Sequence, residues 1–164
     1  MKILLISDSH YKSITKIDLD AYDYILHAGD INRNDIDYLN LYPNSFCVRG
    51  NCDYDSDKEL ENYFTIQGKT FFLCHSHMYG SKEGYSRIIE KGKSLGVDYF
   101  IFGHTHVPTA FYEGNTLFIN PGSFMEGSYM EIIDDKLYSY QKKSLWTKKE
   151  SYHKTLVLKL KKPF

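Results

Sequence analysis

The chain has 164 residues, of which 42% are hydrophobic and 25% charged, and its formal net charge at pH 7 is −1. This length and composition predict one globular domain, 1–164, with a hydrophobic core. The apolar runs are too short for the ~20 residues of a membrane-spanning helix, and three cysteines are too few for a disulfide framework, so we expect a cytoplasmic protein with reduced thiols.

Short apolar runs bounded by turn residues predict the strands. The first run, Met1–Ile6, is followed at once by Asp8 and His10, so it predicts a strand and not a secretion signal. The predicted strands span 2–7, 24–28, 45–48, 63–66, 70–74, 98–102, 110–112, 116–119, 129–133, 136–140 and 155–160. Helical spacing predicts helices over 34–41 and 84–95, with room for only a short helix between the first two strands. Strands alternate with helices up to Phe102 and follow one another afterwards, which predicts an α/β fold of two sheets with helices outside them.

Basic residues gather at the C-terminal end of the sequence. Nine lysines lie from Lys136 on, where Glu150 is the only acidic residue. A segment of this kind suits nucleic acid or another anionic partner. The alternation of Leu156–Lys162 favours a simpler interpretation, a strand whose lysines protect a sheet edge.

Side chains that bind metals follow five of the predicted strands. Because ligands bind beyond the carboxyl ends of strands in open α/β sheets, these side chains are expected to share one site. Each has an ordinary alternative role when taken alone, such as a turn or a helix cap, but five segments together favour a metal centre. The candidate ligands are Asp8, His10, Asp30, Asn51, His75, His104 and His106.

The ligand types select the chemistry of this centre. Imidazole, carboxylate and amide oxygen suit divalent manganese, nickel, iron, cobalt or zinc, and the lack of a cysteine cluster argues against a closed structural zinc site. Seven donors exceed what one catalytic ion with an open position needs, and they fit two ions that share a carboxylate. Two such ions ~3.5–4 Å apart bind a phosphoryl group and generate hydroxide near neutral pH. We therefore expect two divalent cofactor ions, manganese first, and a small phosphoester as substrate.

The order of the motifs resembles that of the calcineurin-like metallophosphoesterase family, and within it the small single-domain phosphodiesterases of bacteria and archaea. The motifs are Asp8-x-His10, Gly29-Asp30, Gly50-Asn51-x-Asp53, His75-x-His77, Gly103-His104-x-His106 and Asn120-Pro121-Gly122-Ser123. The resemblance implies a four-layer α/β/β/α sandwich, two mixed sheets flanked by helices, with the metal site at the carboxyl ends of the strands. It assigns one ion to Asp8, His10, Asp30 and His106, and the other to Asp30, Asn51, His75 and His104, with Asp30 bridging.

The resemblance also assigns catalytic roles and shows departures. Asp30, Asn51 and His104 are expected to act in catalysis, and His77 to orient a neighbour or contact substrate. Many family members carry histidine where this chain has Cys52, which suits activated esters or a different proton donor. Tyr11 and Ser76 replace glycines that are common in the family, and their side chains could narrow the site. Tyr11 could then contact substrate, or it could only cover the loop.

Two alternative functions and a possible homo-oligomer stay open at this stage. A non-catalytic metal-binding scaffold for protein partners is one alternative, and a nuclease that uses the basic C-terminal segment is the other. The natural substrate, the preference between mono- and diesters, and the native metal are not determined by the sequence.

Overall fold

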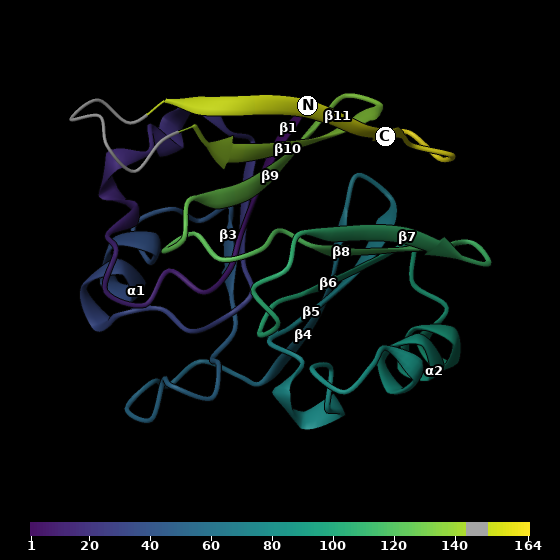
Figure 1. Cartoon of the computed structure of the whole chain (residues 1–164), viewed down its shortest axis with the longest axis horizontal. Coiled ribbons are helices and arrows are strands. Elements are labelled where there is room, and N and C mark those ends of the chain that lie inside the picture. The colour runs from purple at the N-terminus through teal and green to yellow at the C-terminus, as the bar shows by residue number, and fades with distance from the viewer. Residues whose placement is uncertain (144–150) are drawn as a thin grey trace.

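The computed structural model describes residues 1–143 and 151–164 of the chain. Its strands are β1 (Lys2–Ile6), β2 (Tyr24–His27), β3 (Ser45–Cys47), β4 (Glu61–Ile66), β5 (Lys69–Cys74), β6 (Tyr99–Phe102), β7 (Thr109–Glu113), β8 (Thr116–Asn120), β9 (Ser128–Ile133), β10 (Lys136–Lys142) and β11 (Tyr152–Lys159). Its α-helices are α1 (Arg33–Leu39) and α2 (Ser86–Leu95). The strands form two sheets, one of six strands in the order β11-β10-β9-β1-β2-β3 and one of five in the order β4-β5-β6-β8-β7 (Figure 1).

Both sheets are mixed, with parallel strands at the centre. In the first sheet β1 pairs parallel with β2 and β2 with β3, whereas β9, β10 and β11 are antiparallel to their neighbours. In the second sheet β5, β6 and β8 are parallel, and β4 and β7 are antiparallel edge strands. Because parallel strands end on the same side, the loops after β1, β2, β5 and β6 can supply side chains to one edge of the molecule.

Three hydrophobic clusters define the layers. The largest lies between the two sheets and includes Leu5, Leu26, Ile101 and Ile119. Outside the first sheet, Ile36 and Leu39 of α1 pack in a cluster with residues of β1 and β2. Outside the second sheet, Ile88 of α2 packs with phenylalanines of β5, β6 and β8. The predicted four-layer α/β/β/α arrangement is therefore confirmed.

Several predicted boundaries differ from the observed ones. Between β1 and β2 the described chain forms two short 3₁₀ turns, Ile14–Lys16 and Leu19–Ala21, in place of a short α-helix. Helix α2 begins two residues later than expected because Gly84 has a φ of +147°, outside the helical range. No helix in the described part of the chain has the length and hydrophobicity that crossing a bilayer requires.

The basic C-terminal segment forms the edge strand β11. Lys159 pairs with Asp135 at 3.2 Å and Lys162 with Asp98 at 3.4 Å. The ammonium group of Lys154 lies 4.0 Å from the ring centroid of Tyr138. Lysines along an edge strand prevent pairing with another chain, so these contacts favour the structural interpretation of the segment. Residues 144–150, which contain Lys148, Lys149 and Glu150, lie outside the described residues.

Candidate metal centre

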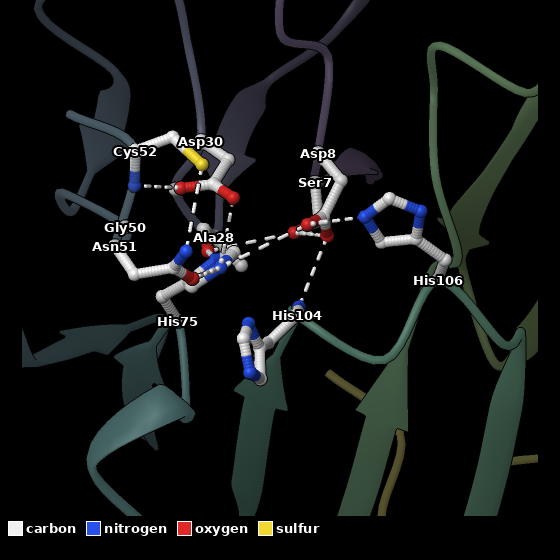
Figure 2. Close-up of polar contacts among 12 residues, drawn as sticks. Ser7, Asp8, Ala28, Asp30, Gly50, Asn51, Cys52, His75, His104 and His106 are labelled. Carbon is white, nitrogen blue, oxygen red and sulfur yellow. Dashed lines mark hydrogen bonds and ion pairs between the residues drawn. The ribbon is translucent and has the colours of Figure 1, made fainter. Parts of the chain in front are cut away.

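Loops from both sheets meet at one edge of the sandwich. Asp8 and His10 follow β1 and Asp30 follows β2, while His75 follows β5 and the His104–His106 loop follows β6. Asn51 lies in the loop between β3 and β4. Figure 2 shows the Asp30, Asn51 and His75 side chains gathered on one side and Asp8 and His106 beside them. The fold therefore brings the sequence-predicted residues to the same place.

The backbone of these loops has an unusual conformation. Asp8, His10, Asp30, His104 and His106 have positive φ values between 48° and 71°. The other described non-glycine residues with positive φ are two hairpin-turn residues and Ser76, which follows His75. Such conformations are uncommon for residues with a side chain and cluster at functional sites, where the surrounding structure holds them.

Two glycines allow the loops to approach closely. A Cβ atom on Gly50 would lie 2.1 Å from Asp30 Oδ1, and one on Gly103 would lie 1.9 Å from Ser7 Oγ. Neither distance is possible for a real carbon atom, so only glycine fits at these positions. The spacing of Gly50-Asn51 and Gly103-His104 in the sequence thus has a steric cause.

One half of the centre is built around Asp8. Asp8 is fully buried, and its Oδ1 atom makes no hydrogen bond although His106 Nε2 lies 3.1 Å away. The second oxygen, Oδ2, accepts hydrogen bonds from Ser7 Oγ at 2.5 Å and from the His104 backbone at 3.1 Å. Asp8, His10 and His106 offer donor atoms within 4.8 Å of one another, close enough for one metal ion.

The other half is built around Asp30 and His75. His75 Nε2 lies 3.3 Å from Asp30 Oδ2 and 3.1 Å from Asn51 Oδ1. The opposite ring nitrogen, Nδ1, donates a hydrogen bond of 2.7 Å to the carbonyl oxygen of Ala28, which leaves Nε2 to face the carboxylates. Asp8, Asp30 and His75 form a further group able to bind a metal ion, so each aspartate adjoins more than one imidazole.

His104 and His77 lie at the margin of this arrangement. The His104 ring centroid is 5.1 Å from that of His75 and 6.1 Å from that of His77. Figure 2 shows the His104 imidazole directed away from the Asp8 carboxylate. His104 belongs to none of the three donor groups found among the described residues, and its contact with Asp8 is made through the backbone. His77 is half-buried, 5.5 Å from His75 between ring centroids.

Cys52 lies beside the metal donors. Its backbone N–H donates to Asp30 Oδ1 at 2.9 Å, and its exposed thiol accepts from Asn51 Nδ2 at 3.4 Å. The thiol also forms a possible metal-binding group with His10 and Asp30. Burial, followed by the charge of Asp30, raises the pKa of this thiol to about 11, so it keeps its proton at neutral pH.

Several supporting residues were not predicted. Glu126 Oε1 accepts from His106 Nδ1 at 3.0 Å, which turns Nε2 toward Asp8. The Asp53 carboxylate accepts backbone N–H groups from Gly50, Asp30 and Ile31 and so joins two loops. The sequence holds a signal for Asp53 alone, because it belongs to the Gly50-Asn51-x-Asp53 motif.

His27 makes hydrogen bonds to two of the loops. Its Nδ1 accepts the backbone N–H of Gly29 at 3.2 Å, so the proton sits on Nε2, which lies 3.0 Å from Ser9 Oγ. This one buried ring therefore connects the loop of Asp8 to the loop of Asp30. Burial lowers the pKa of His27 to about 3, so the imidazole is neutral.

The carboxylates and imidazoles of the site have pKa values shifted from their usual ranges. Burial alone would raise the pKa values of Asp8 and Asp30, but the neighbouring imidazoles of His106 and His75, respectively, hold both below their usual range. The close approach of the Asp8 carboxylate raises the pKa of His106 to about 9. Burial lowers the pKa of His104 to about 4, so its ring is neutral at pH 7. Divalent metals bind ionised carboxylates together with imidazoles that are neutral or that can release a proton.

Comparison with known proteins identifies the family. The family model of the calcineurin-like phosphoesterase superfamily domain matches residues 1–132. The chain belongs to this superfamily. A probable metallophosphoesterase of Bacillus subtilis, YsnB, is 31% identical over 128 residues, which cover 75% of each chain. The Escherichia coli phosphodiesterase YfcE is 31% identical over 84 residues, 46% of this chain and 42% of YfcE.

The fold comparison agrees. Vps29 of Entamoeba histolytica, solved in complex with Zn²⁺, superposes with a TM-score of 0.71 at 23% identity and covers 95% of this chain and 99% of its own. At that identity the likeness shows the fold alone. The superfamily and the names of the sequence relatives support a hydrolase that acts on phosphoesters and uses metal.

Proposed function

We propose that the protein hydrolyses phosphoesters, diesters in preference, with two divalent metal ions bound at the edge where β1, β2, β5 and β6 end. The observation that carries the proposal is the buried Asp8 Oδ1 atom, which lacks a hydrogen bond and lies beside His106 and His75. An unpartnered buried carboxylate oxygen is costly, and a cation bound there would satisfy it.

The proposed ligand set is the one that the sequence predicted. Asp8, His10 and His106 would hold one ion, and Asn51 and His75 the other. Asp30 would bridge the two, because its Oδ2 atom lies 3.8 Å from His10 Nε2 and 3.3 Å from His75 Nε2. His104 would join the second ion by a rotation of its side chain. Manganese is the proposed native metal, and when bound such ions supply hydroxide near neutral pH and neutralise charge on the phosphate.

The residues of the chain itself define the remaining chemistry. Neutral His104 and His77 imidazoles at the margin can accept or donate hydrogen bonds to phosphate oxygens. Cys52, protonated at neutral pH, is the group nearest the donors that could give a proton to the leaving oxygen. A thiol with a pKa of about 11 is a weak acid for this task, so we expect esters with good leaving groups to react fastest.

The test is hydrolysis of bis-p-nitrophenyl phosphate and of p-nitrophenyl phosphate with added Mn²⁺ or Ni²⁺. We expect metal-dependent release of p-nitrophenolate, faster from the diester. Asp30→Asn removes the proposed bridging charge and should abolish the activity, whereas Asp20→Asn, at an exposed position of a 3₁₀ turn, is the matched control. Full activity of Asp30→Asn would refute the site.

A scaffold for protein partners is the second candidate, because a protein of the same fold, Vps29 of Chaetomium thermophilum, has been solved with a bound cyclic peptide. In that case the same edge would bind a protein partner, with or without metal. Ester hydrolysis by the Mn²⁺-loaded protein separates the two. Failure to hydrolyse either ester, with or without retained metal, would favour the scaffold.

A further inference from the structure

Two hollows adjoin the candidate metal centre between the His10–Tyr11 loop and the loop of residues 51–56. The first, of ≈ 250 Å³, is lined by His10 and Asp30 of the centre and by Tyr11. The second, of ≈ 200 Å³, is lined by Ile36 and Tyr54. They share a wall made of Ile31, Asn32, Cys52 and Asp53. The shared residues place the two hollows next to each other, and we name the pair the tyrosine groove.

Two exposed aromatic side chains flank this groove. Tyr11 is 85% exposed and Tyr54 is 87% exposed, so both rings present open faces. Single exposed aromatic residues are ordinary on protein surfaces. These two differ because Tyr11 lines the hollow that contains His10 and Asp30, and Tyr54 lines the adjoining hollow.

The polar side chains common to both hollows are already engaged within the protein. Asn32 caps α1 by accepting from Asp35 N, and its amide donates to the His10 carbonyl at 3.0 Å. Asp53 accepts three backbone N–H groups. These two side chains therefore have little capacity left to read a pattern of hydrogen bonds on a ligand. Arg33, which contacts the Asp55 carbonyl oxygen at 3.4 Å and the Asp37 carboxylate at 3.6 Å, lines only the hollow of Tyr54.

What the groove offers a ligand is flat and apolar. Ile31 and Ile36, 4% and 2% exposed, contribute apolar lining, and the two tyrosine rings offer stacking faces. Stacking on aromatic side chains accepts any planar ring and does not discriminate by hydrogen bonds. The small side chain of Cys52 lines both hollows.

We propose that the tyrosine groove binds a flat aromatic ring of the phosphoester, a nucleobase or an aryl group, while the phosphate occupies the metal centre. The inference rests on the proposed function and specifies its substrate class. Tyr11 and Tyr54 are the specificity-determining residues. The groove selects substrates by the flatness of the ring, and it binds different nucleobases with similar affinity.

The test compares two inhibitors with the same anionic group and rings of similar size, one flat and one puckered. Phenylphosphonate and cyclohexylphosphonate compete with bis-p-nitrophenyl phosphate in the Mn²⁺-loaded protein. We expect phenylphosphonate to inhibit at a concentration about tenfold lower, which corresponds to about 1.4 kcal/mol. Using the ratio of the two inhibition constants cancels any general change in metal loading.

The variants are Tyr11→Leu and Tyr54→Leu, which keep an apolar side chain but remove the flat ring. Tyr11→Leu, in the hollow that contains the metal donors, should lower the ratio to about twofold, in line with the usual strength of base–aromatic stacking, and Tyr54→Leu, in the adjoining hollow, should lower it less. Tyr63→Leu, at a 53% exposed position of β4 that lines neither hollow, is the matched control and should keep the full ratio. Thermal melts of all variants confirm that each is folded.

The outcomes separate the two proposals. If the protein hydrolyses the diester but both phosphonates inhibit wild type equally, or the two tyrosine variants keep the wild-type ratio, the groove inference is overturned and the proposed function stands. If no ester is hydrolysed and neither phosphonate binds, the proposed function fails and the inference fails with it. Adenosine and thymidine 5′-p-nitrophenyl phosphodiesters should differ by less than about threefold, and strong preference for one base would contradict selection by flatness.

Discussion

The contact between His106 and Glu126 leads to a quantitative prediction for metal binding. His106 Nδ1 is held by Glu126 Oε1 at 3.0 Å, while Nε2 faces Asp8 Oδ1 at 3.1 Å. The carboxylate of Glu126 fixes the tautomer and the orientation of the ring. Glu126→Gln should therefore weaken Mn²⁺ binding, because the ring loses a charged acceptor that directs Nε2 to the ion.

The exposure of Glu126 sets the expected magnitude. Loss of such a partner typically reduces metal affinity about 10- to 100-fold. The Glu126 side chain is 58% exposed, so solvent screens its charge and the lower end of that range applies. We expect about a tenfold loss, or about 1.4 kcal/mol.

The dependence on pH provides an independent check of the cause. The neighbouring carboxylates of Asp8 and Glu126 raise the pKa of His106 to about 9, so the metal-free wild type must release a proton to bind an ion at neutral pH. Removing Glu126 lowers that pKa, which eases proton release and opposes the loss of affinity. Easier proton release favours the variant most at low pH, where His106 of the wild type is protonated. The ratio of wild-type to variant Mn²⁺ affinity should therefore increase as the pH rises from 7 to 8.5.

Calorimetric titration with Mn²⁺ at both pH values measures this ratio. Glu90→Gln, at an exposed position of α2, is the control and should bind like wild type. Affinity of Glu126→Gln within twofold of wild type at pH 8.5, or a ratio that narrows with rising pH, would refute the assigned role of Glu126.

Three further predictions concern other residues of the centre. Asp30→Asn should lose one Mn²⁺ ion by metal analysis, and retention of both would show that Asp30 does not bridge. Buried His27 has a folded pKa of about 3, below its unfolded value of 6.5, so it contributes stability that is present above pH 6.5 and is lost as the pH falls. Between pH 6.5 and 5 the free energy of unfolding should fall by about 2 kcal/mol from this group, at 1.36 kcal/mol per pH unit. Urea titrations of His27→Gln over this pH range should show a smaller fall than those of the wild type. An equal fall in both proteins would argue against this role. Gly103→Ala would force a Cβ against Ser7 and should lower the free energy of unfolding by about 1–3 kcal/mol, which an unchanged urea midpoint would contradict.

The sequence by itself determined the layers and the candidate donors, because both depend on local patterns. Apolar runs fill the buried strands β1, β2, β5 and β6, and the chain leaves each of them at polar residues with donor atoms. Parallel strands that end at one edge bring those residues together, so their convergence could be predicted without coordinates. Residues 84–85 were misassigned to α2 because apolar spacing does not reveal a glycine with a φ of +147°.

Only the tertiary structure decided which neighbours orient the donors. Glu126 and His106 are 20 positions apart, and Ser9 and His27 are 18 apart, so no sequence spacing joins them. The His104 side chain, equivalent to the others by motif, is turned away from Asp8, since a loop backbone and its packing set that direction. Likewise Tyr11 and Tyr54 line adjoining hollows because two loops that are far apart in the sequence fold next to each other.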